Sequence, residues 1–431
     1  MKIIQIVPGF GGTFYCGNCL RDSALVQSLR KEGHDALTVL MYLPLTLNGQ
    51  TQPEEVPVFY GAVNLYLKQN YPWLRGMPGF MERFLNSKAI LSYAAHKAGS
   101  TRATGLEEMT ESMLLGSEGN QHEELEELVD FLKKEKPDVV HLSNALLLGL
   151  AKRIKEEVKI PVIFSLQDED VWVDAMHESF REGIWELMAQ KGEDVDGFIA
   201  VSHFYAGVMQ QRMKIPDEKI HVVHIGVNAD AYKPSPPATD PPAIGYLSRM
   251  NGENGFELLI DAFIELKQNN SFAPLRLYAT GGMTGDDKPF INKQMQKLKQ
   301  ANLSGQVEII HDFRQDQLSD FFRKITLLSV PVLKGEAFGL YQLEALASGV
   351  PLVQPALGAF PEIIDATGGG VVYRPNTSSA LAAKLADVLG SAEQIERMST
   401  DGIKAVKRQF NCGNLTRKMV VIYQQILDKK Q

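Results

Sequence analysis

The sequence has little cysteine, no excess of basic residues and no long hydrophobic run. Three cysteines in 431 residues exclude a small secreted protein held together by disulfides. The 44 Lys and Arg against 52 Asp and Glu give a net charge of −8, which argues against a nucleic-acid-binding protein. No stretch approaches about 18 uninterrupted apolar residues, and the run Ile3–Val7 is too short for a signal peptide. We therefore expect a cytoplasmic protein without a membrane span.

What is present is an ordinary globular composition, 44% hydrophobic and 22% charged, at a length typical of two to three domains. Short runs rich in Val and Ile alternate with helical patterns along the chain. In Glu123–Lys136 the apolar residues recur at i, i+3, i+4 and i+7, and Ser202 is a natural N-cap for a helix over His203–Met213. The alternation predicts βαβ units and parallel sheets.

Five prolines within residues 232–242 favour a linker, because proline resists both helix and inner strand. The same alternation resumes after it. We therefore predict an N-terminal α/β domain over 1–231, the linker, and a second α/β domain over 243–412. A final helix over 413–431 is expected to pack back on the first domain, and a ligand is expected at the carboxyl ends of the strands, in a cleft.

The pattern most indicative of chemistry joins two glutamates, Glu336 and Glu344, across a turn that leads into a helix at Gly339. The free N–H groups and positive dipole end of that helix would suit an anion such as a diphosphate. Glu344 would lie just inside the helix, where it can accept hydrogen bonds from sugar hydroxyls. The alternative is a solvated helix face after a turn glycine.

These residues, with Leu343–Pro351 and Gly358–Glu362, resemble the signature of the family 4 retaining glycosyltransferases, which have the GT-B fold of two Rossmann-like domains. The resemblance extends over nearly the whole chain. It implies a nucleotide-sugar donor, an acceptor of unknown chemistry, and neither a metal nor another cofactor.

The resemblance also implies roles for individual residues. Glu336 would contact hydroxyls of the donor sugar, and Glu344 would bind the ribose. Arg249 and the amides of Gly339 and Leu340 would hold the diphosphate. The remaining donor-binding positions are Gly11, Gly12, Lys334 and Phe338.

Two positions depart from the family pattern. Asn254 stands where a diphosphate-binding Lys is usual, and Gln167 stands where a catalytic His often follows the strand Val162–Leu166. We expect Lys334 to supply the missing charge and Gln167 to take the catalytic position. The departures leave open a weakly active or non-catalytic nucleotide-sugar-binding protein. A sugar phosphorylase or an epimerase on the same fold is a further alternative.

Three other features have competing interpretations. Cys16-Gly17-Asn18-Cys19 has the spacing of a redox site, but we favour local packing. The acidic run Asp168–Asp170 resembles a metal site, but we expect solvated loop acids or acceptor contacts. The aromatic and basic segment 59–97 would form an acceptor wall or a peripheral membrane contact, or it would be an inserted helical subdomain, and these interpretations do not exclude one another.

Overall fold

The computed structural model describes residues 1–9, 14–42, 46–47, 50–51, 103–314 and 317–429. The chain divides into two compact units, and neither is continuous in sequence. Unit 1 comprises residues 1–11, 18–224 and 416–431, and unit 2 comprises residues 12–17 and 225–415. The sequence had predicted a boundary at 231. Residues 225–242 instead belong to unit 2, as do the few residues before α1.

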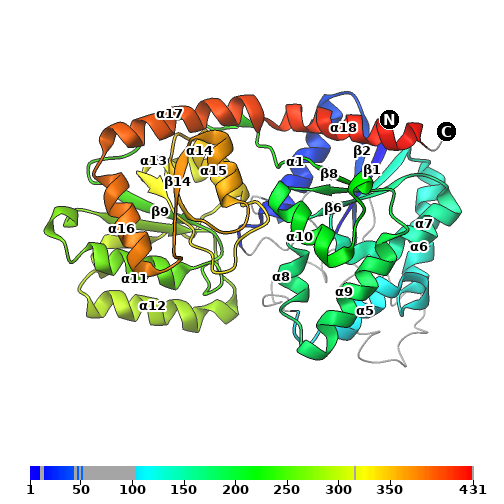
Figure 1. Ribbon diagram of the computed structural model, residues 1–431, viewed down its shortest axis with the longest axis horizontal. Helices are drawn as coiled ribbons and strands as arrows, with labels where there is room; N and C mark the ends of the chain where they lie inside the picture. Colours follow the sequence, from blue (N-terminus) through cyan, green and yellow to red (C-terminus); the bar gives the residue numbers. More distant parts are fainter. Residues whose placement is uncertain (10–13, 43–45, 48–49, 52–102, 315–316, 430–431) are drawn as a thin grey trace. The chain divides into compact units, whose positions relative to one another are not determined.

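Unit 1 is built on a parallel six-stranded sheet in the order β2-β1-β5-β6-β7-β8. Its strands are β1 (Lys2–Val7), β2 (Asp35–Leu40), β5 (Val139–Leu142), β6 (Val162–Leu166), β7 (Gly197–Ala200) and β8 (Ile220–Val222), and a short antiparallel pair β3 (Thr46–Leu47) and β4 (Gln50–Thr51) lies outside it. Its helices are α1 (Gly17–Lys31), α5 (Glu107–Leu115), α6 (His122–Glu135), α7 (Ala151–Val158), α8 (Glu169–Val173), α9 (Glu178–Gly192) and α10 (His203–Met213). This is the predicted doubly wound pattern (Figure 1).

Unit 2 repeats the architecture with a parallel sheet in the order β11-β10-β9-β12-β13-β14. Its strands are β9 (Ala243–Leu247), β10 (Arg276–Thr280), β11 (Val307–Ile309), β12 (Leu327–Leu328), β13 (Leu352–Pro355) and β14 (Gly370–Tyr373). Its helices are α11 (Phe256–Leu266), α12 (Lys288–Gln300), α13 (Leu318–Arg323), α14 (Leu340–Ala347), α15 (Phe360–Thr367), α16 (Ser378–Leu389) and α17 (Ala392–Gln409). The strand order reverses direction between β9 and β12, which is where doubly wound sheets bind ligands.

The periodicities read from the sequence correspond to buried faces. In α6 the four apolar residues Leu125, Leu128, Val129 and Leu132 are fully buried, as amphipathic spacing requires. Ser202 caps α10 by accepting a hydrogen bond from the Tyr205 amide at 3.0 Å. The sheet strands are mostly apolar and buried, as expected for parallel strands covered on both faces.

The helix α18 (Cys412–Asp428) begins in unit 2, and from Thr416 onward it belongs to unit 1. Tyr423 is fully buried there, and its hydroxyl lies 2.6 Å from Nδ1 of His141 in β5. Ile426 packs so closely on Gly197 that a Cβ at that glycine would lie 2.6 Å from its Cδ1. Figure 1 draws α18 beside the elements of unit 1, with both marked chain ends in that unit.

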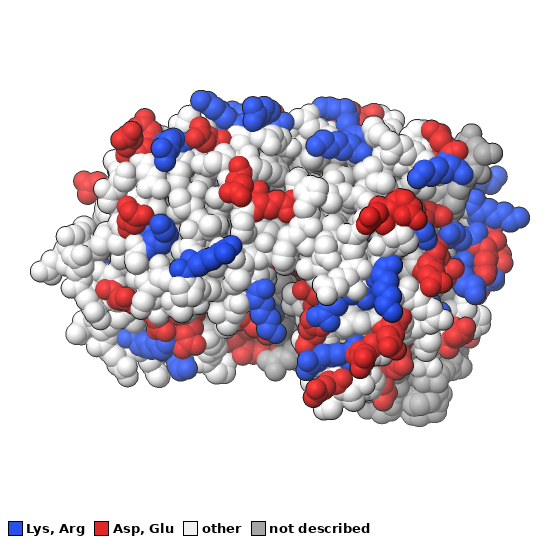
Figure 2. Space-filling model, viewed as in Figure 1, with Lys and Arg blue, Asp and Glu red and all other residues white. Residues whose placement is uncertain are grey.

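The described surface mixes both signs of charge. Figure 2 shows acidic and basic side chains interspersed on the visible face of each unit. Many form ion pairs, for example Arg153 with Glu126 and Glu157 in unit 1 and Lys297 with Glu257 in unit 2. Among the described helices, none combines the length and apolar character that crossing a bilayer requires.

Candidate functional site

In unit 2 the loops after β9 and β12 come together at the carboxyl edge of the sheet. The Leu333 amide donates to the Glu253 carbonyl at 3.0 Å, which joins the two loops. Gly255 has φ +75°, and a Cβ there would lie 1.9 Å from the Pro331 carbonyl oxygen. Only glycine permits this approach. The sequence therefore places the two loops in contact at the point where the strand order reverses.

Arg249, in the loop after β9, is held by a carboxylate of its own unit. Its Nε and Nη2 donate to the two oxygens of Asp287 at 2.9 Å each, and Nη2 also reaches Thr284 Oγ1 at 3.1 Å. Burial would raise the pKa of Asp287, but the bonds from Arg249 and Thr284 hold it below its ordinary value. The fork of Arg249 is thus fixed in orientation before any ligand arrives.

The helix predicted after Glu336 is α14, with Gly339 as its N-cap at φ +82°. All eight helical residues are buried, and Phe338, just before it, is 1% exposed. The side chain of Phe338 packs within unit 2, with its ring 6.4 Å from that of Phe410. The expected donor-binding positions Gly339 and Leu340 therefore begin a buried helix, and Phe338 supports it from the protein side.

Glu344, in the second turn of α14, is fully buried and accepts from two tyrosines. The Tyr15 hydroxyl lies 2.6 Å from Oε2, and the Tyr232 hydroxyl lies 2.7 Å from Oε1. Burial raises the pKa of Glu344 to about 7, although both hydroxyls favour the ionised form. The sequence predicted sugar hydroxyls as partners, whereas in this structure both carboxylate oxygens are bound by hydroxyls of the chain.

Glu336 lies half-buried before α14 and accepts from the Tyr341 hydroxyl at 2.6 Å on Oε2. Gly358 must be glycine beside it, because a Cβ there would lie 2.4 Å from the Glu336 amide nitrogen. The loop after β13 thus fixes the backbone of Glu336, and Tyr341 fixes one of its oxygens. The carboxylate is oriented at the same sheet edge as α14.

Lys334 and Asn254 lie on the two joined loops, each next to a residue of the Leu333–Glu253 hydrogen bond. Lys334 is exposed. Asn254 closes its own loop, because its Nδ2 donates to Ser248 Oγ at 3.0 Å and to the Arg249 carbonyl at 3.1 Å. Where the resembling family usually has a lysine, this chain therefore has Asn254, whose side-chain amide closes the loop. The lysine Lys334 lies on the neighbouring loop.

Residues 14–17, which precede most of α1, pack on unit 2. The Tyr15 amide donates to the Gly281 carbonyl at 2.8 Å, and Phe14 forms an antiparallel bridge with Gly282. The Arg249 guanidinium lies 5.3 Å from the centre of the Phe14 ring. Gly17 lies against α14, since a Cβ there would be 3.3 Å from Cβ of Leu340.

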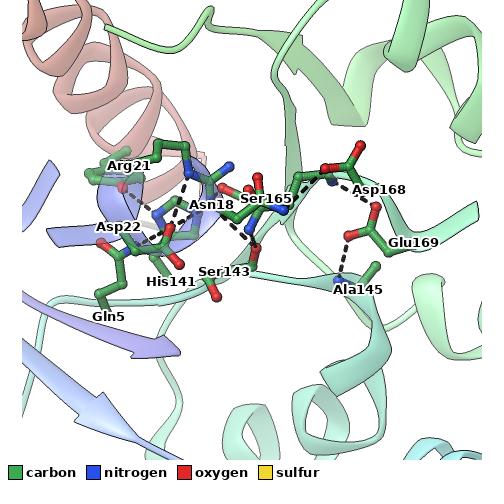
Figure 3. Close-up of polar contacts among 12 residues, drawn as sticks. Gln5, Asn18, Arg21, Asp22, His141, Ser143, Ala145, Ser165, Asp168 and Glu169 are labelled. Carbon is green, nitrogen blue, oxygen red and sulfur yellow. Dashed lines mark hydrogen bonds and ion pairs between the residues drawn. The ribbon is translucent and has the colours of Figure 1, made fainter. Parts of the chain in front are cut away.

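A second polar cluster lies at the carboxyl ends of β1, β5 and β6 in unit 1 (Figure 3). Arg21 and Asp22 of α1 form a buried ion pair at 2.5 Å, and the Arg21 Nη2 also reaches the Ser143 carbonyl at 3.4 Å. His141 is bonded at both ring nitrogens, by Tyr423 and by Ser165. Burial, assisted by Arg21, lowers the pKa of His141 to about 3, so it is a neutral core residue.

Gln167, the expected replacement for a catalytic histidine, is 3% exposed at the end of β6. Its Nε2 donates to the Ser143 carbonyl at 2.6 Å. Its Oε1 is buried without a hydrogen-bond partner among the described residues. Such an atom is costly unless a ligand or water satisfies it, so it is a candidate acceptor for a hydroxyl.

Within the acidic run after Gln167, Glu169 is not the solvated loop acid that the sequence led us to expect, whereas acceptor contacts by this run stay a prediction. Glu169 is fully buried and accepts from the Ala145 amide, the Gln167 amide and the Tyr205 hydroxyl (2.7–2.9 Å). Burial raises its pKa to about 7 despite these bonds. Asp168 has φ +58° and accepts from Asn18 Nδ2 at 3.1 Å. Glu169 therefore fixes the loop, and Asp168 lies nearer the surface.

Some predicted positions fall outside the described residues. These are Gly11, Gly12 and the segment 59–97. Cys16 and Cys19 are both half-buried around the start of α1.

Sequence reasoning missed Tyr15, Tyr232, Thr284 and Asp287. Only the last two had a local signal, because Thr284-x-x-Asp287 before a helix has the spacing of a capping box.

Two family models match the chain. The model described as "Glycosyl transferases group 1" matches residues 228–405, and "Glycosyltransferase Family 4" matches residues 115–231. Together they include the loops and helices of both polar clusters, apart from the residues before and within α1 and Tyr423 of α18.

Curated relatives agree with these matches at low identity. A lipopolysaccharide core biosynthesis mannosyltransferase, LpsB of Rhizobium meliloti, is 24% identical over 43% of this chain and 52% of its own length. A D-inositol 3-phosphate glycosyltransferase of Xylanimonas cellulosilytica is 25% identical over 60% of this chain and 58% of its own length. The chain thus spans about half the length of these relatives.

Solved structures share the fold of the whole chain. Sucrose-phosphate synthase from Thermosynechococcus elongatus superposes with a TM-score of 0.72 at 15% identity, covering 100% of both chains. Anabaena HepE, solved in complex with UDP, gives a TM-score of 0.69 at 15% identity, covering 99% of this chain and 100% of its own. The predicted GT-B architecture is confirmed.

Proposed function

We propose, from the premise that the chain belongs to the group 1 and family 4 glycosyltransferases, that it transfers a sugar from a nucleotide-sugar donor to an acceptor with retention of configuration. One observation carries the proposal. A preoriented arginine, Arg249, and the N-terminus of the buried helix α14 lie on loops of one sheet edge, where the strand order reverses. A cation and a helix N-terminus are the groups that bind a diphosphate.

Catalysis by this arrangement would be electrostatic. As the bond from the sugar to the diphosphate breaks, negative charge grows on the leaving oxygen. Arg249 and the first amides of α14 are fixed before the reaction, so they stabilise that charge without reorganising. We propose that Glu336, oriented by Tyr341, accepts from hydroxyls of the transferred sugar. In unit 1, the buried Oε1 of Gln167 would accept a ligand hydroxyl.

We further propose that Lys334 takes the role of the missing lysine. The hydrogen bond between Leu333 and Glu253 keeps its loop beside that of Asn254. Asn254→Lys should then add little to the wild type but partly restore turnover in Lys334→Ala, because both cations serve one charge. Strictly additive effects on donor turnover would show that the two positions do not share a ligand.

The first experiment is a calorimetric titration with UDP-, GDP- and ADP-sugars, followed by a donor hydrolysis assay in which the anomer released is identified by NMR. UDP-sugars come first, because a fold neighbour was solved with UDP. Arg249→Ala should weaken nucleotide binding by about tenfold or more, the value of a charge-assisted hydrogen bond. Arg314→Ala, which removes an exposed arginine paired with Asp312, is the matched control. Release of the inverted anomer would refute retention.

A second candidate is a nucleotide-sugar-binding protein without transfer activity. Asn254 and Gln167, which stand where a diphosphate-binding Lys and a catalytic His are usual, favour it. In that case nucleotide binds, and is lost in Arg249→Ala, but neither hydrolysis nor transfer occurs with any acceptor. Turnover that requires inorganic phosphate, or that interconverts nucleotide-sugar epimers, would instead indicate a phosphorylase or an epimerase.

A further inference from the structure

Glu344 is the carboxylate that the family resemblance assigns to the nucleotide ribose, yet each of its oxygens already accepts a hydrogen bond. Tyr15 and Tyr232 each donate to a different oxygen, at 2.6 and 2.7 Å, and the glutamate is fully buried. Because the glutamate has no exposed surface, a ribose hydroxyl can reach this carboxylate only if a neighbouring group such as one of the tyrosines moves. The two tyrosines differ in how they are held.

Tyr232 lies in the proline-rich segment that packs on unit 2. The nearby Ser235 amide donates to the Ser348 carbonyl at the end of α14, at 3.2 Å, and the Ala238 amide donates to the Ile325 carbonyl at 3.3 Å. These bonds tie the chain that follows Tyr232 to the same unit as Glu344. This tyrosine is a fixed part of the carboxylate's surroundings.

Tyr15 has a different attachment. It lies in residues 14–17, a short segment bound to unit 2, whereas α1 belongs to unit 1 from Asn18 onward. Its contacts with unit 2 include the bond from its amide to Gly281, the bridge from Phe14 to Gly282, and the hydroxyl bond to Glu344. Phe14 also lies against the guanidinium of Arg249. The segment therefore covers both groups that a nucleoside diphosphate requires.

We propose that Phe14 and Tyr15 form an internal competitor for the nucleotide site. The Tyr15 hydroxyl occupies the ribose position on Glu344, and the Phe14 ring occupies the face of Arg249, until a nucleoside diphosphate displaces both. This inference rests on the proposed function. It makes Tyr15 a determinant of nucleotide affinity that acts by occupying the site.

The test compares wild type, Tyr15→Phe and Tyr373→Phe for binding of UDP, GDP and ADP by calorimetry. Tyr15→Phe removes only the hydroxyl that competes for Glu344, so the nucleotide that binds the wild type should bind about tenfold more tightly. Tyr373, whose hydroxyl donates to Asn376 at 2.7 Å in the same unit, is the matched control and should leave the affinity unchanged.

A second readout does not depend on affinity. Cys16 is half-buried next to Tyr15, so its alkylation rate reports whether the segment is docked. In a Cys19→Ser, Cys412→Ser background, Tyr15→Phe should speed alkylation of Cys16, and saturating nucleotide should speed it in the protein that retains Tyr15. Because Cys19 and Cys412 are replaced in this variant, the alkylation rate that is measured is that of Cys16.

The outcomes distinguish a failure of this inference from a failure of the proposed function. Weaker nucleotide binding in Tyr15→Phe would make Tyr15 a ribose ligand and overturn the competition while leaving the proposed function intact. Unchanged affinity with unchanged alkylation would also overturn it. If no nucleotide binds either protein, the proposed function fails, and the competition fails with it.

Discussion

Replacement of Glu344 by glutamine should make the stability of unit 2 less sensitive to pH. Burial of the carboxyl outweighs the two tyrosine bonds and raises its pKa from 4.5 to about 7 on folding. A difference of that size corresponds to about 3 kcal/mol between the folded and unfolded states. Glutamine has nearly the same shape, can still accept from one tyrosine and donate to the other, and does not ionise.

The sign follows from proton binding. Below about pH 4.5 Glu344 is neutral in both states, and its contribution is fully present. Between pH 4.5 and 7 the unfolded chain loses the proton while the folded protein keeps it, so wild-type stability falls as pH rises. Above about pH 7 Glu344 is ionised in both states, so the loss of stability levels off. Relative to wild type, Glu344→Gln should therefore gain about 3 kcal/mol across this interval.

The assay is urea unfolding from pH 4.5 to 8, followed by hydrogen exchange resolved on peptides, because two units need not unfold together. Peptides of β9 and β12 report unit 2, and peptides of β6 and β7 serve as an internal reference. Glu396→Gln, an exposed glutamate of α17, is the matched control and should follow the wild-type curve. If the free energy of unfolding of Glu344→Gln changed with pH in parallel with that of wild type over the whole range, the reasoning would be refuted.

Three further predictions concern single features. Gly255→Ala should destabilise unit 2 by more than about 2 kcal/mol in thermal unfolding, because its Cβ would overlap the carbonyl of Pro331 at a positive φ. Donor turnover should persist in EDTA, since we propose that protein groups meet the diphosphate charge. Strict Mn²⁺ dependence, abolished by Asp168→Asn, would contradict this. The double variant Cys16→Ser, Cys19→Ser should keep donor turnover within a few-fold, and a disulfide reductase activity that it lacks would contradict local packing.

The control for the glycine substitution is Gly285→Ala. A Cβ there meets no heavy atom within 4 Å, so thermal unfolding should be nearly unchanged. Equal losses in the two variants would mean that the contact at Pro331 is not the cause.

The fold could be predicted from local patterns, because each pattern corresponds to a surface that must be buried. The apolar spacing in α6 and the N-cap at Ser202 depend only on residues that are close in sequence. The structure confirms both the buried face and the cap. Alternation of strands and helices then leaves few topologies, since crossovers are right-handed. The family resemblance adds the GT-B arrangement, which the solved neighbours confirm.

The partners of the site residues could not be predicted in this way. Glu344 is bonded by residues 329 and 112 positions away in sequence, and Arg249 by one 38 positions away. No spacing rule connects such residues. The burial of Glu169 could not be predicted for a related reason, because its three donors come from three different segments of the chain.

The return of α18 to unit 1 affects the order in which the protein can be completed during synthesis. His141 receives its bond from Tyr423, which is 282 residues later in the chain. At roughly 5–20 residues per second, a ribosome needs on the order of 15–60 s to make that interval. Residues 225–415 of unit 2 are made in the meantime, while the surface at Gly197 that Ile426 covers stays open. The unit that begins the chain is therefore the last to close, and a nascent chain stopped after unit 2 would expose an apolar strip on unit 1.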